Sequence, residues 1–233
     1  MEVTRTKLAE GVYLTFHPAQ KFKTSLLSAQ LVTPLRWETA SACALLPSLL
    51  RRGTVSCPDL GALSARLDGL YGARIDCTVR KKGENQCVGF VASLIDDSYA
   101  PGGERLLEPV AALLGELVCD PVTERGRFVP AYFDSEKANL IDAIRSILND
   151  KREYADGRLL REMCAGEAYG IPRLGDGKSA ERIQPQKLYA MYRKLIGSAR
   201  LELFYSGSAG RERVEQALRA AFFQLRQYSA AEL

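Results

Sequence analysis

The chain has 233 residues, of which 46% are hydrophobic and 26% are charged, and these values are ordinary for a globular protein. Its formal net charge of +4 is spread along the chain, and the densest basic cluster, residues 80–86, has the composition of a solvated hairpin tip. No apolar run approaches 18 residues, and the first residues lack the pattern of a secretory signal. We therefore expect a cytoplasmic protein with one large domain or two small ones and with no nucleic-acid or membrane partner.

Histidine and cysteine limit the metal chemistry of the chain. His17 is its single histidine, so a zinc site with two histidine ligands cannot form. His17 follows alternating apolar residues, which indicates a structural position at the end of a strand. The six cysteines lack C-x-x-C spacing and are expected to be reduced, mostly buried thiols: Cys43, Cys57, Cys77, Cys87, Cys119 and Cys164.

The first third of the chain predicts strands and then two helices. Residues 11–17 and 23–35 are apolar strands, and the short connection between them predicts a hairpin. Residues 38–52 place an apolar face at helical spacing and end at Gly53, which fits a helix C-terminus. Pro47 lies inside this helix and predicts either a kink or two short helical pieces. Pro58 and Asp59 then open a second helix.

The remainder of the chain predicts a hairpin, four helices, and a closing strand and helix. Residues 73–94 form the hairpin, with Gly83 in its turn. Amphipathic or helical patterns follow at residues 103–118, 132–149, 154–168 and 184–196, and residues 201–225 read as strand, turn and helix. Hairpins mixed with runs of helices favour an α+β layer fold over a regular βαβ repeat.

A glycine-containing segment and two acidic pairs could belong to functional sites, but structural roles are expected for them. Residues 205–213, YSGSAGRER, place glycines between a strand and a helix, but they match neither a dinucleotide fingerprint nor a P-loop, so an ordinary turn is expected. The acidic pairs Asp96 with Asp97 and Asp134 with Glu136 are expected to be solvated in loops rather than to perform acid–base chemistry.

The order of these motifs resembles a known family. A hairpin, a helix ending in LLRRGT, and then CPDLGALSARLDGLYGARIDCTVRKKGENQCVGF are similar to the N-terminal domain of the insulinase-like (pitrilysin, M16) metallopeptidases. The closing strand and helix are similar to those of the same domain, so the resemblance covers about residues 8–227. It implies the M16 metallohydrolase fold, LuxS/mitochondrial-processing-peptidase-like, with an antiparallel-rich mixed sheet packed against several helices.

Active members of this family carry H-x-x-E-H, in which two histidines one helical turn apart bind zinc and the glutamate takes a proton from zinc-bound water. With Gly53 and Thr54 as the anchor, these positions fall on Ala44, Pro47 and Ser48. The third ligand, from the later helix, falls on Ala143. Glu136 matches an upstream glutamate of the family. The resemblance thus implies a lost zinc motif and no metal cofactor.

Two functions are favoured at this point; a third, a small-molecule enzyme in the residual cleft, has no nucleophile–base pair to support it. The first is an inactive homologue that binds a peptide or a protein partner, because the active family adds extended peptides to a sheet edge without needing zinc for that contact. The second is a metallopeptidase that uses a displaced metal site, with Asp142, Glu136, Ser48 or the cysteines as ligands, although carboxylates without imidazole suit harder cations.

Family members usually continue into a second, similar domain. We therefore interpret residues 1–233 as one M16-like N-terminal domain whose C-terminal half is absent. The motifs LLP, LYGA and KKGE resemble the non-catalytic bacterial members linked to aminopentanol modification of elongation factor P. That resemblance implies an active M16 sibling subunit as a partner.

Overall fold

The computed structural model describes residues 2–223, and its centre is a six-stranded sheet in the order β1-β2-β8-β3-β5-β4. Every neighbouring pair is antiparallel except β2 with β8, which is parallel. The mixed, mostly antiparallel sheet confirms the predicted fold class. The strands are β1 (Thr4–Ala9), β2 (Val12–Pro18), β3 (Thr24–Pro34), β4 (Arg74–Lys82), β5 (Asn85–Ile95) and β8 (Arg200–Gly207).

The predicted hairpin between residues 11–17 and 23–35 is wrong. β2 and β3 do not pair with each other, because β8 lies between them and pairs with both. The five residues that connect β2 to β3 can extend about 17 Å, which is enough to pass one intervening strand. The second predicted hairpin is confirmed: β4 and β5 pair from Arg74 with Ser93 to Lys82 with Asn85, around Gly83 at a φ of 56°.

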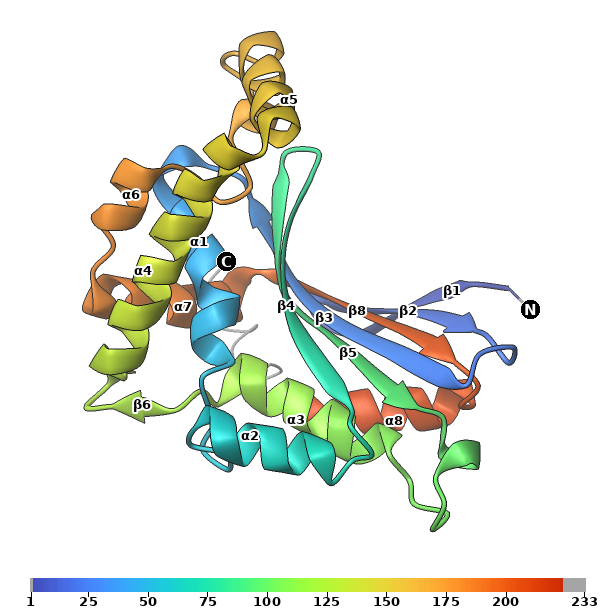
Figure 1. Cartoon of the computed structure of the whole chain (residues 1–233). Helices are drawn as coiled ribbons and strands as arrows, with labels where there is room; N and C mark the ends of the chain where they lie inside the picture. The colour runs from blue at the N-terminus through green and yellow to red at the C-terminus, as the bar shows by residue number, and fades with distance from the viewer. Residues whose placement is uncertain (1, 224–233) are drawn as a thin grey trace.

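The helices gather on one side of the sheet and leave much of the other side uncovered (Figure 1). α3 and α8 pack together and contact β5, β3 and β2, while α1 contacts β4, β5, α4 and α6. The helices are α1 (Trp37–Leu50), α2 (Leu60–Asp68), α3 (Leu107–Cys119), α4 (Pro130–Ser146), α5 (Lys151–Met163), α6 (Gly177–Glu181), α7 (Pro185–Ser198) and α8 (Arg211–Ala221). None of the described helices is long and apolar enough to cross a membrane.

α1 is one continuous helix with Pro47 inside it, so the predicted division into two short pieces is wrong, while a bend at Pro47 stays a prediction. Its apolar surface is also wider than one face, because the sheet, α4 and α6 enclose it and bury nine of its residues. After Leu50 the chain turns at Gly53. A side chain there would place its Cβ 2.6 Å from the Pro58 carbonyl oxygen, so glycine is required by this close approach.

Several element boundaries differ from the expectations. β1 was not predicted, because its sequence TRTKLA contains few apolar residues. The helix expected at residues 154–168 lies at Lys151–Met163, since the Asp150 side chain caps its N-terminus by accepting from the amides of Arg152 and Glu153. The small strands β6 (Thr123–Glu124) and β7 (Arg127–Phe128) and helix α6 lie in segments for which no helix or strand was predicted. Residues 224 and 225 of the last predicted helix lie outside the described residues.

The basic hairpin tip is packed rather than fully solvated. Gln86 is fully buried, and its Nε2 donates to the carbonyl oxygens of Ala40 at 2.9 Å and Arg173 at 2.7 Å. Lys81 donates from Nζ to the carbonyl oxygens of Tyr169 at 2.6 Å and Ile171 at 3.2 Å. These bonds fix the tip of the β4–β5 hairpin against α1 and the segment between α5 and α6.

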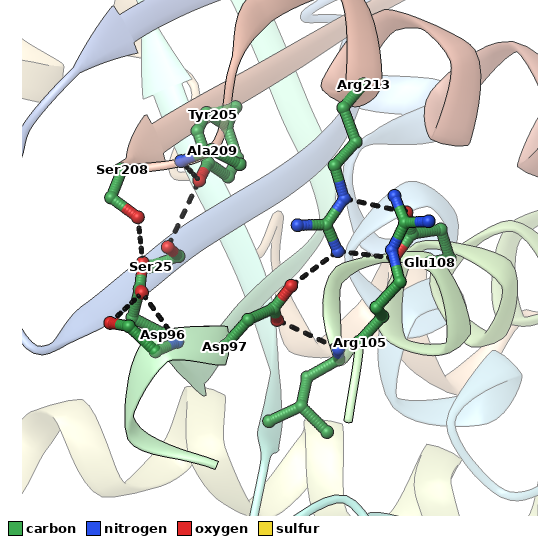
Figure 2. A network of polar contacts seen from close by, with 11 residues as sticks. Ser25, Asp96, Asp97, Arg105, Glu108, Tyr205, Ser208, Ala209 and Arg213 are labelled. Carbon is green, nitrogen blue, oxygen red and sulfur yellow. Dashed lines mark hydrogen bonds and ion pairs between the residues drawn. The ribbon is translucent and has the colours of Figure 1, made fainter. Parts of the chain in front are cut away.

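The acidic pair Asp96–Asp97 is part of a polar network, not a solvated loop (Figure 2). Asp96 is only 9% exposed and accepts hydrogen bonds from Ser98 and Ser208. Asp97 pairs with Arg213 of α8 at 2.5 Å, and the same guanidinium binds Glu108 of α3 at 2.6 Å. The network therefore joins the end of β5 to the two helices that cover the sheet.

The segment YSGSAGRER is a strand-to-helix turn, as expected. The Tyr205 hydroxyl accepts a hydrogen bond from the Ala209 amide at 3.0 Å and lies 3.2 Å from Ser25 Oγ (Figure 2). A Cβ at Gly207 would collide with Ser25 and Tyr205, so the glycine permits this close packing. His17 is likewise structural, since its Nδ1 lies 2.9 Å from Ser206 Oγ where β2 and β8 pair.

Candidate functional site

Four of the motif positions line one cavity of about 480 Å³ between α1, α4 and β4. Ala44 and Ser48 lie one turn apart on α1, and Glu136 and Ala143 lie two turns apart on α4. The spacings of four and seven residues keep each pair on one face of its helix. Pro47 is buried in α1 but does not line the cavity. That Ala44, Ser48 and Ala143 are former ligand positions, and Pro47 the former position of the base, stays a prediction.

The cavity lacks a set of side chains that would hold a metal ion. Ala44 and Ala143 carry no donor atom, and within residues 2–223 no three His, Cys, Asp or Glu side chains converge on one point. Asp142, a candidate ligand for a displaced site, is exposed and is not a lining residue. Nothing in the described residues therefore favours the displaced metal site considered from the sequence.

Glu136 is engaged in an ion pair across the two helices. Arg52, just beyond α1, donates from Nε to Glu136 Oε1 at 2.5 Å and from its terminal nitrogen to Ser135 Oγ at 2.9 Å. The Glu136 side chain is only 12% exposed, so the guanidinium supplies the charge that compensates this partly buried carboxylate. The pair connects the end of α1 to the first half of α4.

Cys77 supplies a thiol to the same cavity from β4. Burial raises the pKa of this thiol to about 11, against the opposing effects of the Arg51 guanidinium and a hydrogen bond with Ser48. A thiol with this pKa is protonated at neutral pH, and the thiolate is the form that attacks electrophiles or binds metals. Cys77 therefore serves as a half-buried packing residue rather than as a nucleophile.

A second cavity, of about 600 Å³, lies between the last residues of β4 and helix α5. It continues into the first cavity, because both are lined by the same five residues: Val79, Ile147, Glu153, Arg173 and Leu174. We call the two cavities together the β4 groove. It runs beside β4 from Cys77 to Lys82, with α1, α4 and α5 on its other side.

β4 is an edge strand, and it lies at the edge of the sheet that faces α4 and α5 (Figure 1). It pairs only with β5, and no backbone hydrogen bond joins it to another segment of residues 2–223. In an antiparallel pair every second residue directs its N–H and C=O groups away from its partner. The nine residues of β4 thus present free backbone groups along about 30 Å, and the part from Cys77 to Lys82 borders the groove.

The sequence indicated the α1 and α4 positions but missed the rest of the groove. Cys77, Val79 and the Arg52–Glu136 pair were not identified, because their approach to α1 and α4 depends on tertiary packing. α5 carries one signal that the sequence offers: Tyr154, Leu159 and Met163 are exposed apolar residues, and Tyr154 lines the groove. That pattern is typical of a helix that borders a binding surface.

Comparison with known proteins gives one relative of similar sequence and many similar structures. The chain is 33% identical over 207 residues to the "Probable inactive metalloprotease YmfF" of Bacillus subtilis, which covers 88% of this chain and 49% of the relative. No family model matches the chain.

Among solved structures, a conserved protein from Enterococcus faecalis matches with a TM-score of 0.86 and 27% identity, over 94% of this chain and 52% of that one. The M16 peptidase inactive domain from Pseudomonas fluorescens matches with a TM-score of 0.73 and 16% identity, over 100% of this chain and 53% of that one. The chain thus has the M16 peptidase fold and spans about half the length of the proteins it matches.

Proposed function

We propose that this chain, a member of the M16 peptidase family, is a catalytically inactive N-terminal domain that binds extended peptide segments along β4. One observation carries the proposal: the free edge of β4 runs beside a groove that contains the vacated motif positions. The printed name of the Bacillus subtilis relative, an inactive metalloprotease, supports the absence of catalysis.

The absence of catalysis follows from the side chains at the motif positions. A zinc peptidase needs ligands with lone pairs and a base that takes a proton from the bound water. Ala44 and Ala143 offer no lone pair, and Pro47 offers no base. The ion pair with Arg52 engages Glu136, the carboxylate of α4 that lines the cavity. We infer that Ala44, Pro47, Ser48 and Ala143 occupy the vacated positions of a zinc motif.

Peptide binding requires none of these side chains. An extended peptide can pair with β4 and extend the sheet by one strand, so that main-chain hydrogen bonds supply affinity and the neighbouring cavities select side chains. At about 3.3 Å per residue, β4 accommodates a segment of about nine residues. α5 and α4 would then cover the outer side of the added strand.

We further propose that residues 1–233 form one M16-like domain of a longer, two-domain protein. The coverage of about half of each matched protein supports this interpretation. A second homologous domain and an active M16 sibling subunit would complete a chamber over the groove. We place the protein in the cytoplasm, where its six unpaired thiols remain reduced.

The first experiment tests catalysis directly. We expect the purified, untagged chain to hold less than one zinc ion in ten molecules after incubation with equimolar zinc, as measured by mass spectrometry of the metal. It should also leave a quenched fluorescent peptide library uncut. Stoichiometric zinc together with cleavage that a chelator abolishes would overturn the assignment as an inactive homologue.

The second experiment tests strand addition to β4. Fluorescence polarisation with a positional-scanning library of labelled nonapeptides selects a binding sequence, which is then N-methylated on alternate residues in two sets. Because only every second amide faces β4, methylation of one set should abolish binding, while methylation of the other set should leave it nearly unchanged. Equal effects of the two sets, or no binding by any pool, would contradict the proposal.

A further inference from the structure

We propose that the β4 groove selects acidic peptide segments in which acidic and apolar side chains alternate. This inference rests on the proposed function, because it names the kind of peptide that the same edge strand would accept. It is carried by the distribution of charge and apolar surface around β4 and α5, in which cations outnumber carboxylates.

The half of the groove next to α5 is strongly basic. Its lining contains six cationic side chains and two carboxylates, those of Glu153 and Asp156. The cationic residues are Arg80, Lys81, Lys82, Arg158, Arg161 and Arg173. The groove therefore attracts negative charge before any specific contact forms.

Three of these cations have no carboxylate within ion-pair distance in residues 2–223: Arg80, Lys82 and Arg161. By contrast, Arg173 lies 3.5 Å from Glu153, and Arg158 lies 3.5 Å from Glu162. Lys81 donates to two backbone carbonyl oxygens instead. An incoming carboxylate would therefore find cations that no internal partner has neutralised.

The alternation of side chains along β4 gives the expected peptide pattern. Arg80 and Lys82 point to the uncovered face of the sheet, where both also line a cavity with Arg200 and Phe204. Val79 and Lys81, which flank Arg80 in the strand, point to the helical side of the sheet, and Val79 lines both cavities of the groove. A strand beside β4 would place its own alternate side chains opposite these two sets.

Side chains of the peptide on the uncovered face would meet Arg80 and Lys82 at about 5 Å between Cβ atoms, a distance at which carboxylates form ion pairs. Side chains on the helical side would enter the space between Val79, Leu160 and Leu174, which is mostly apolar. The geometry thus favours acidic residues at every second position of the peptide and aliphatic or aromatic residues at the positions between them.

The test compares three labelled nonapeptides with the same apolar residues at alternate positions and with Glu, Gln or Lys at the positions between them. We expect the Glu peptide to bind the full chain about fivefold more tightly than the Gln peptide at low salt, because two exposed ion pairs are each worth roughly 0.5 kcal/mol. The Lys peptide should bind more weakly than either. Raising the salt to about 0.5 M should remove most of the difference.

Matched variants locate the effect. R80Q/K82Q removes both cations that the peptide carboxylates meet, so it should weaken binding of the Glu peptide about fivefold and leave the Gln peptide unchanged. K187Q/K194Q removes two exposed lysines from α7, neither of which lines the groove, and should change neither peptide.

The outcomes separate this inference from the proposed function. Equal binding of the three peptides would overturn the acidic preference and leave strand addition intact, whereas no binding of any peptide would count against strand addition itself. A preference for Glu that R80Q/K82Q does not reduce would also overturn the inference. So would a dimer in sedimentation equilibrium that R80Q/K82Q dissociates, because the groove would then bind a second copy of the chain.

Discussion

Replacement of Pro47 by alanine should stabilise the protein, although Pro47 is buried. Proline has no amide to donate to the Cys43 carbonyl oxygen and crowds that oxygen, which costs about 3 kcal/mol relative to alanine inside a helix. The substitution also removes about two buried methylene groups, at about 0.8 kcal/mol each. The balance is a gain of about 1.5 kcal/mol in the free energy of unfolding, or about 3–6 °C in Tm for a chain of this length.

Urea denaturation and differential scanning calorimetry would measure this gain. The control is P185A, because Pro185 occupies the first turn of α7, where the missing amide has no helical partner to lose. P185A should destabilise the protein slightly, by about 0.4–1 kcal/mol, through the greater entropy of the unfolded chain. A P47A variant that is less stable than the parent, or that shifts in the same direction as P185A, would refute the reasoning.

Three other predictions address packing, pH and metal binding. Q86M should lower the free energy of unfolding in urea by about 1–3 kcal/mol, because two buried carbonyl oxygens lose their donor; unchanged stability would contradict the packed hairpin tip. The hydrogen bonds from Arg213 lower the pKa of Glu108, so Glu108 stabilises the folded protein above its unfolded pKa of about 4.5. This contribution should be lost as the pH falls further. In urea titrations at a series of pH values, R213Q should reduce the loss of stability at acid pH. The motif positions are tested with the quadruple variant A44H/P47E/S48H/A143E, which should gain a site for one zinc ion that the parent lacks. Zinc titration calorimetry measures the binding. A folded variant that binds no zinc would argue against the alignment of these positions with the zinc motif.

Local patterns in the sequence were sufficient for the elements that depend on neighbouring residues. The β4–β5 hairpin follows from two alternating segments around Gly83, and α1 follows from apolar residues at helical spacing. The helical spacing also explains why Ala44 and Ser48, and Glu136 and Ala143, lie in pairs on one face of each helix. The structure then brings both pairs to one cavity, although the role of Ala44, Ser48 and Ala143 as vacated ligand positions stays a prediction.

Contacts between distant segments were not accessible in the same way. β2 pairs with β8, a strand about 190 residues later in the sequence. A parallel pair has no turn between its strands that the sequence could reveal. The prediction of a hairpin between neighbouring strands was therefore wrong. The acidic pair at Asp96 was expected to be solvated, because its partners Ser208 and Arg213 lie more than 100 residues away. In each case the prediction failed because the contact joins segments that are distant in the sequence and meet only in the folded protein.

The central position of β8 has a consequence for synthesis of the protein on the ribosome. β3 is complete at Pro34, but β8 begins at Arg200, about 165 residues later. At roughly 5–20 residues per second, the facing edges of β2 and β3 would wait about ten to thirty seconds for the strand that joins them. During that interval the facing edges of β2 and β3 in the nascent chain have no strand to pair with. We expect ribosome-associated chaperones to bind such exposed apolar segments.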